Sequence, residues 1–356
     1  MSNNNSINPT ESVNTMTSDN PVQNDNADSE KSTADNAAVR LQQASTLANH
    51  IFNEIKKVLI GQDDIVEQVL VTLIARGHVL IEGVPGLGKT LLVRSLAKCF
   101  GGQFSRVQFT PDLMPSDVTG HAMFNMSKQE FEIRRGPVFT NLLLADEINR
   151  APAKTQAALL EVMQEGQITI EGESFKTGEP FMVLATQNPI EQEGTYPLPE
   201  AELDRFMLKV VIDYPNEENE QIMLRQICSQ NQGGFGLENI RTLLKASQVL
   251  SLQKIAEQIT VDDQILQYIV KLVRSTRSWA GITRGAGPRA CIALLSASRA
   301  YALLNNNSFV TPDDVKKMFI PALRHRILLS PELAIEGVAA EKILQTILSQ
   351  VPAPRH

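Results

Sequence analysis

The stretch from Val79 to Leu91 limits the possible fold of this chain more than any other. It reads V-L-I-E-G-V-P-G-L-G-K-T-L and contains the pattern G-x-x-x-x-G-K-[ST]. Its apolar start predicts a short buried strand, its glycines a loop, and the residues after Thr90 a helix. In such a loop the backbone N–H groups turn inward, and the helix adds the positive end of its dipole. The stretch therefore predicts a phosphate-binding loop.

The residue types of this loop match the parts of a nucleotide phosphate chain. Glycines permit the sharp turns, Lys89 can reach the β- and γ-phosphates, and the Thr90 hydroxyl can ligate Mg²⁺. A glycine-rich turn without a ligand is the alternative for the loop alone. The predicted cofactor-binding residues of the loop are Gly83, Val84, Pro85, Gly86, Leu87, Gly88, Lys89 and Thr90.

Composition narrows the class of protein. A length of 356 residues suggests two domains and a tail. The formal net charge is −7, and residues 1–39, with six acids and one base, carry −5 of it. No basic excess is left to drive non-specific nucleic-acid binding, which argues against that class of partner. Three dispersed cysteines predict reduced thiols and a cytoplasmic location, and neither a signal peptide nor a membrane-spanning run is evident.

The chain divides into three predicted regions. Residues 1–38 are polar and acidic and predict a disordered tail. Residues 39–214 alternate helical and strand patterns and predict an α/β domain that begins with an amphipathic helix at 39–58. Residues 215–356 predict helices alone, over 216–230, 238–257, 262–277, 288–304, 311–325 and 334–350. Shorter features are a hairpin or short helix at 125–137 and a hairpin at 167–176.

Two further apolar strands end in polar residues. The run from Asn141 ends in Asp146 and Glu147, and the run 181–186 leads to Asn188. The carboxyl ends of parallel strands open on a ligand crevice, so Asp146 can hold Mg²⁺ and Glu147 can polarise an attacking water. Asn188 can touch the γ-phosphate or that water. The alternatives are a polar strand end and a turn-forming Asn before proline.

Taken together, the motifs resemble those of AAA+ ATPases, and the residue sequences of several motifs resemble those of the MoxR family within them. The resemblance covers residues 40–350. It rests on six strings in this order: GVPGLGKT at 83–90, QFTPDL with PSD at 108–117, ADEINRA at 145–151, ATQNP at 185–189, EAELDRF at 200–206 and GAGPRA at 285–290. It implies a P-loop AAA+ parallel sheet flanked by helices, followed by a C-terminal all-helical lid domain.

The resemblance also implies roles for single residues. Lys89 and Thr90 are similar to the Walker A pair, and Asp146 and Glu147 to the Walker B pair. Further implied roles are sensor 1 for Asn188, an arginine finger acting in the neighbouring subunit's site for Arg205, sensor 2 from the lid of the same subunit for Arg289, a place beside the adenine for Gly61 and Gln62, and a second interface position for Arg150.

Both arginines have a simpler alternative. Arg205 could form a surface ion pair at a strand start, and Arg289 could meet solvent at the start of a helix. Read as in the family, the implied catalytic residues are Glu147, Asn188, Arg205 and Arg289, with Thr90 and Asp146 as metal ligands.

The family resemblance implies a function and its partners. The expected protein is an ATPase that uses ATP and Mg²⁺, forms a homo-oligomeric ring of six subunits, and remodels or matures client protein complexes. A protein with a von Willebrand factor A domain is the expected partner. The segments 125–137 and 167–176 resemble elements that face the pore of such rings. Alternatives are a nucleic-acid-dependent AAA+ motor, a chelatase-type ATPase subunit and a nucleotide-regulated scaffold; nucleic acid is the less favoured partner.

Overall fold

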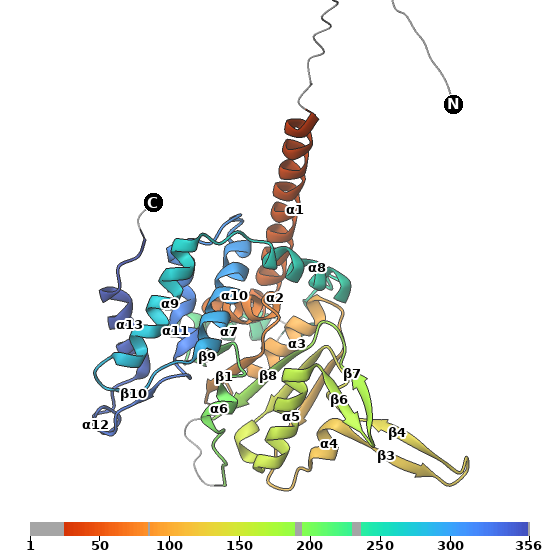
Figure 1. Ribbon diagram of the computed structural model, residues 1–356. Helices are drawn as coiled ribbons and strands as arrows, with labels where there is room; N and C mark the ends of the chain where they lie inside the picture. Colours follow the sequence, from red (N-terminus) through yellow and green to blue (C-terminus); the bar gives the residue numbers. More distant parts are fainter. Residues whose placement is uncertain (1–24, 85, 189–193, 230–235, 355–356) are drawn as a thin grey trace, which may run out of the picture. The chain divides into compact units, whose positions relative to one another are not determined.

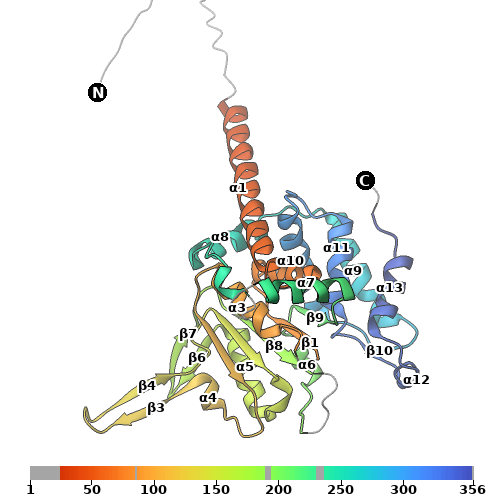
Figure 2. The ribbon, with the colours of Figure 1, turned by 180° about the vertical axis from the view of Figure 1, so that it is seen from behind.

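A computed structural model describes residues 25–84, 86–188, 194–229 and 236–354 (Figures 1 and 2). Residues 1–39 and residues 40–356 form two separate compact units, and each is considered by itself. In the first unit the described residues are helical. They belong to α1 (Asp25–Lys56), which therefore begins earlier than the predicted Val39. For residues 25–38 the predicted disordered tail is thus replaced by helix, whereas residues 1–24 lie outside the described residues.

A five-stranded parallel sheet forms the centre of the second unit. Its strands are β1 (Val79–Gly83), β2 (Phe104–Gln108), β5 (Leu142–Asp146), β8 (Met182–Gln187) and β9 (Leu208–Ile212), in the order β2-β5-β8-β1-β9. All four neighbouring pairs are parallel. The near-continuous apolar runs of β1, β5 and β8 are explained by burial on both faces of the sheet.

Alternate residues of the central strands enter two different apolar clusters. Leu142 and Leu144 pack with α2 (Asp63–Ile74), α3 (Lys89–Cys99) and the second-unit part of α1. Leu143 and Ala145 pack on the other side with α5 (Ala153–Glu165). This two-sided burial fixes the direction of each strand end, where the polar residues follow. Across the described residues, none of the helices is both long and apolar enough to span a membrane.

Two antiparallel hairpins leave the sheet region. The hairpin predicted at 167–176 is confirmed as β6 (Gln167–Ile170) and β7 (Glu173–Lys176). The segment 125–137 is the hairpin of the two options, but its first strand starts earlier, as β3 (Gly120–Asn125) pairs with β4 (Glu130–Arg135). It follows the short helix α4 (Pro115–Thr119), and both views show it extending away from α4 and α5.

The part after β9 is mainly helical. Its elements include α7 (Glu217–Ser229), α8 (Ala246–Glu257), α9 (Asp263–Ser278), α10 (Pro288–Leu304), α11 (Pro312–Leu323), α12 (Pro331–Ile335) and α13 (Ala340–Gln350). Thr311 caps α11 with its hydroxyl, and proline stands first in the helix, as helix starts favour. The expectation of helices alone is wrong at one place, because β10 (Ile282–Arg284) pairs with β11 (Leu328–Leu329). These strands are too short to show a periodic pattern.

Arg326 joins this helical part to the sheet. Its side chain is only 3% exposed and donates from Nε to Asp204 Oδ1 at 2.6 Å. Its other nitrogens donate to the carbonyls of Phe206 (2.7 Å), Met207 (3.0 Å) and Asp204 (3.1 Å). His325 adds a bond from Nε2 to the Phe206 carbonyl at 2.9 Å. Arg326 thus holds the segment 204–207, which contains Arg205, against the end of α11 by side-chain hydrogen bonds.

Candidate nucleotide-binding site

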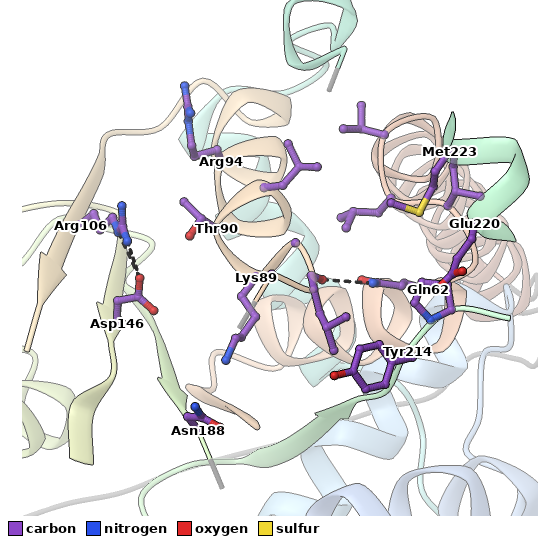
Figure 3. A pocket seen from close by; sticks show the side chains of 18 of the residues that line it. Gln62, Lys89, Thr90, Arg94, Arg106, Asp146, Asn188, Tyr214, Glu220 and Met223 are labelled. Carbon is purple, nitrogen blue, oxygen red and sulfur yellow. Dashed lines mark hydrogen bonds and ion pairs between the residues drawn. The ribbon is translucent and has the colours of Figure 1, made fainter. Parts of the chain in front are cut away.

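A cavity of about 720 Å³ opens at the carboxyl ends of β1, β5 and β8. Figure 3 shows Arg106, Asp146 and Thr90 on one side of it and Gln62 and Tyr214 on the other, with Lys89 between them. The other lining residues are Val58, Leu59, Ile60, Gly86, Leu87, Gly88, Leu91, Arg94, Glu147, Asn188, Pro215, Glu220 and Met223.

The loop before α3 has the backbone that its glycines predict. Gly86 (φ +88°) and Gly88 (φ +80°) occupy the left-handed region, where side chains are disfavoured. Gly88 also directly precedes Lys89, the first residue of α3, so the free backbone N–H groups in the first turn of α3 lie at the cavity. Lys89 donates from Nζ to the Gly83 carbonyl at 2.7 Å. Gly83 and Val84 are not lining residues, and Pro85 lies outside the described residues.

The opposite wall consists of the turn before α2 and the start of α7. Gln62 is 9% exposed and donates from Nε2 to the Leu87 carbonyl at 3.1 Å, which ties this wall to the loop. Gly61 lines an adjoining cavity of about 640 Å³ instead. A Cβ on Gly61, whose φ is +74°, would collide with the Asn219 side chain of α7. Of the two residues expected beside the adenine, Gln62 lines both cavities, whereas Gly61 lines the adjoining one.

The acids at the end of β5 are oriented by β8. Thr186 donates from Oγ1 to Asp146 Oδ1 at 2.6 Å and accepts from the Glu147 N–H at 2.9 Å. Glu147 has φ +55°, an uncommon conformation for a residue with a side chain. This backbone turns Glu147 away from the strand direction. Asp146 is 13% exposed and Glu147 is 26% exposed, so both carboxylates remain accessible from the cavity.

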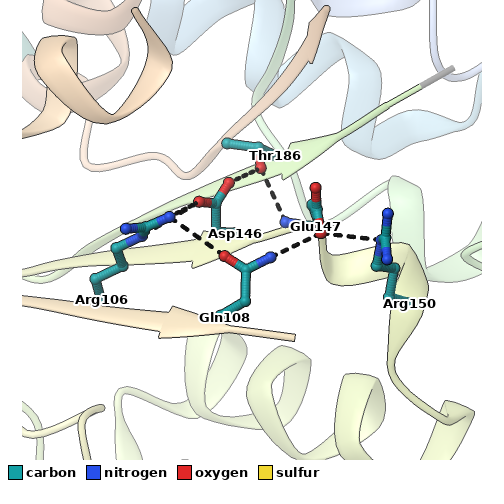
Figure 4. Close-up of polar contacts among 6 residues, drawn as sticks. All are labelled: Arg106, Gln108, Asp146, Glu147, Arg150 and Thr186. Carbon is teal, nitrogen blue, oxygen red and sulfur yellow. Dashed lines mark hydrogen bonds and ion pairs between the residues drawn. The ribbon is translucent and has the colours of Figure 1, made fainter. Parts of the chain in front are cut away.

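The neighbouring strand β2 supplies a partner for each acid. Gln108 stands opposite Asp146 in the ladder. Arg106 donates to Asp146 Oδ2 from NH2 at 2.6 Å and from Nε at 3.2 Å. Gln108 donates from Nε2 to Glu147 Oε2 at 2.7 Å, and Arg150 Nε lies 2.9 Å from the same oxygen. Figure 4 shows these contacts as one continuous polar network.

The geometry agrees with two family profiles. Residues 78–208 match the ATPase family associated with various cellular activities (AAA), and residues 274–347 match the AAA lid domain. The chain is 42% identical to Chaperone MoxR1 of Mycobacterium tuberculosis, over 87% of this chain and 83% of that protein. The chain belongs to the MoxR family of AAA+ ATPases.

Two further comparisons support membership in the MoxR family. The chain is 46% identical to the protein YeaC of Bacillus subtilis, over 84% of this chain and 92% of that one. The crystal structure of a putative ATPase from Cytophaga hutchinsonii superposes with a TM-score of 0.83 at 39% identity, and covers 92% of this chain and 99% of that chain. The 38 kDa magnesium-chelatase subunit of Acidiphilium rubrum is more distant, at 28% identity over 60% of this chain and 61% of that protein.

Two arginines that MoxR-family motifs single out lie outside the cavity. Arg205 is bound within its own chain, by Glu202 Oε2 to Nε at 2.7 Å and by the Leu160 carbonyl to NH1 at 3.3 Å. Arg289 is exposed in the first turn of α10, near enough to Arg326 to lower the pKa of that guanidinium, although burial is the larger cause. Residues of α7 line the cavity and Arg289 does not, so the expected contact of Arg289 with a phosphate of the same subunit stays a prediction.

Sequence reasoning missed the lining residues Arg106 and Tyr214, and also Gln108, which bonds Glu147 without lining the cavity. Arg106 and Gln108 alternate along an edge strand, and this spacing of two places them on one side of β2. Tyr214 was interpreted only as a domain boundary, yet it lines the cavity. Asn188, by contrast, lies where the pattern predicted, directly after β8, lining the cavity and 5% exposed.

Proposed function

We propose that the chain binds and hydrolyses ATP with Mg²⁺ in this cavity. One observation carries the proposal: Lys89, Thr90, Asp146, Glu147 and Asn188, from separate motifs, line a single cavity. The positive-φ glycines and the start of α3 supply N–H groups suited to phosphate oxygens. The Thr90 hydroxyl and the Asp146 carboxylate offer the oxygen ligands that Mg²⁺ prefers, so the residues present fit the metal.

Each residue has a distinct part in the proposed reaction. Lys89 binds the β- and γ-phosphates with its ammonium group, which in this structure donates to the Gly83 carbonyl. Thr90 and Asp146 hold the metal, which neutralises charge on the phosphates when bound. Glu147 orients the attacking water and accepts its proton, and Asn188 holds that water in line. Gln108 and Arg150 both contact Glu147 at Oε2.

A ring completes the proposed site. Arg205 and Arg289 lie outside the cavity of their own chain, and both are neighbours of Arg326, through segment 204–207 and by charge proximity. We assign Arg289 to the nucleotide phosphate of its own subunit, which it would contact from the lid, and Arg205 to the cavity of the adjacent subunit in a homo-oligomeric ring of six. To reach it, Arg205 would exchange its contact with Glu202 for a phosphate oxygen.

The proposed use of this ATPase is remodelling or maturation of client protein complexes in the cytoplasm, with a von Willebrand factor A-domain protein as partner. The similarity to Chaperone MoxR1 supports a chaperone role. The β3–β4 hairpin presents Phe131 (73% exposed) and Met126 (84% exposed), which suits contact with an unfolded polypeptide. The described cysteines Cys99, Cys228 and Cys291 are free thiols, as a reducing compartment favours.

The test is a pair of measurements on purified wild type and Glu147→Gln. The wild type should hydrolyse ATP with a rate per subunit that rises with protein concentration. Glu147→Gln should bind ATP with wild-type affinity, hydrolyse it at least about a hundredfold more slowly, and stay assembled. Normal turnover in this variant would contradict the role of Glu147. Stimulation of hydrolysis by DNA at moderate salt would instead favour the nucleic-acid motor.

A further inference from the structure

We propose that Arg106 is a built-in competitor of Mg²⁺: its guanidinium holds Asp146 when no metal is bound, and the arriving metal must displace it. The inference deepens the proposed function and rests on it. Arg106 stands on β2, two residues before Gln108, and no motif of the sequence singles it out.

The contact between Arg106 and Asp146 is a strong one for an accessible pair. Two guanidinium nitrogens, NH2 and Nε, donate to the same carboxylate oxygen, Oδ2, at 2.6 Å and 3.2 Å. The other oxygen, Oδ1, accepts from Thr186. Both oxygens of Asp146 therefore have a donor. A metal that binds Asp146 through Oδ2, directly or through a water molecule, meets a positive group already in that place.

Gln108 fixes the guanidinium in this position. Its Oε1 accepts from Arg106 NH2 at 3.3 Å, while its Nε2 donates to Glu147. Gln108 thus selects the Arg106 rotamer that faces the acids. Since the same amide bonds Glu147, departure of Arg106 removes one of the two bonds that orient Gln108. We expect Gln108 to act on the metal only through Arg106, as a positioning residue.

Release of Arg106 meets no structural obstacle. Its side chain is 48% exposed, and β2 is an edge strand of the sheet. A displaced guanidinium can therefore become hydrated without a new buried partner. The 13% exposure of Asp146, in contrast, keeps its carboxylate poorly hydrated, so that it prefers a cation at all times. Mg²⁺ would thus replace the Arg106 guanidinium at Asp146, so that this carboxylate has a cationic partner both before and after the metal binds.

The inference predicts the magnesium dependence of nucleotide binding. The probe is the fluorescent nucleotide methylanthraniloyl-ADP, titrated with Mg²⁺ after EDTA treatment, on the full chain. Arg106→Met should lower the Mg²⁺ concentration at half-saturation by roughly three- to tenfold, the range for a partly exposed but charge-assisted contact. Arg106→Lys, which retains the charge but loses the two-nitrogen contact, should fall between Arg106→Met and the wild type. Gln108→Leu should give a smaller shift than Arg106→Met.

Arg94→Met is the matched control. Arg94 also lines the cavity and is exposed, but among the described residues the donors to the Asp146 carboxylate are Arg106 and Thr186, not Arg94. Removing its charge should shift the half-saturation by less than about twofold, the size of a screened surface effect.

Three results would overturn the inference. The first is a half-saturation in Arg106→Met that is unchanged or higher than in the wild type. The second is an equal shift in Arg94→Met. The third is weaker nucleotide binding by Arg106→Met at saturating Mg²⁺, which would make Arg106 a phosphate ligand. Lys89→Ala separates this inference from the proposed function, because nucleotide binding that persists unchanged in Lys89→Ala would refute the site itself.

Discussion

The cavity and the segment that contains Arg205 differ in how completely one chain builds them. At the cavity, residues from the loop at 83–90 and from the ends of β5 and β8 meet in one place, and each acid already has a partner from its own chain. Arg205 and Arg289, in contrast, do not line the cavity that the loop, β5 and β8 form. The difference teaches that, on our proposal, nucleotide binding is a property of the single chain, whereas fast hydrolysis belongs to two chains together.

The largest expected effect is on Arg205. Arg205→Ala should bind nucleotide normally but lose about a thousandfold in rate per subunit, as expected for an arginine supplied in trans. The measurement is ATPase rate against protein concentration. Arg284→Ala is the control, because Arg284 pairs with Glu200 near the same segment, and its loss should change the rate less than about threefold. If each site were complete within one chain, the rate per subunit would not change with protein concentration and would be the same in Arg205→Ala as in the wild type.

The next largest effect is on nucleotide binding rather than on the rate of hydrolysis. Lys89→Ala should weaken nucleotide binding by about a hundredfold, the size of a lost charge-assisted contact with phosphate. The measurement is titration calorimetry with ATP and Mg²⁺. Lys98→Ala is the control, because Lys98 lies on the same helix but donates to the carbonyls of Leu237 and Glu238. Equal affinity in Lys89→Ala and wild type would break the comparison, because the cavity would then not be the binding site.

A smaller effect tests the joint between the helical part and the sheet. Arg326→Met should cost about 2 kcal/mol of unfolding free energy, because Asp204 and several carbonyls lose their donor, although Asp204 is 25% exposed and can gain water. Urea unfolding measures it. Arg324→Met should cost less, since Arg324 has a longer contact of 3.4 Å with Glu341. In folded Arg326→Met, hydrolysis should fall while nucleotide affinity holds; a drop in both would contradict the division.

The last expected effect concerns stability in acid and should involve both regions. Burial lowers the pKa of His78, next to β1, to about 4, and burial also lowers the pKa of His325. Below the usual value of about 6.5 the unfolded chain takes up protons that the folded chain refuses. Stability should therefore fall as the pH drops from 6.5 towards 4, by about 1 kcal/mol per pH unit for each group.

Urea unfolding of wild type and His78→Gln, at several pH values between 7.5 and 5, measures this dependence. The variant should show a shallower loss of stability on acidification than the wild type. His121→Gln, at an exposed position on β3, should retain the wild-type slope. An identical slope in His78→Gln would show that His78 is not among the groups responsible.

Sequence reasoning succeeded where the signal is local. The loop at Lys89 and the acids after β5 follow from runs of adjacent residues, because burial of a strand and a turn of glycines leave a pattern in one stretch. It missed Arg106, because the contact with Asp146 depends on which strand pairs with β5 and in which register. That pairing joins residues 40 positions apart and leaves no trace in either stretch.

The position of Arg289 relative to the cavity could not be predicted from the sequence for the same reason. Its motif places it at a helix start, and the structure agrees. Which cavity that helix faces, however, depends on how α10 packs against α2 and α11, and tertiary packing of this kind is not periodic in sequence. The early start of α1 reflects alanines at 27, 34, 37 and 38, which favour helix although the stretch is too polar to predict a core.

The hydrogen bonds of Arg326 have a mechanical consequence. A planar guanidinium that donates to three carbonyls of one short segment, those of Asp204, Phe206 and Met207, resists a shift of any one of them alone. We therefore expect segment 204–207 and the end of α11 to move together. A displacement of α11 should then shift Arg205 as well, so that the position of this side chain depends on a helix that does not line the nucleotide cavity.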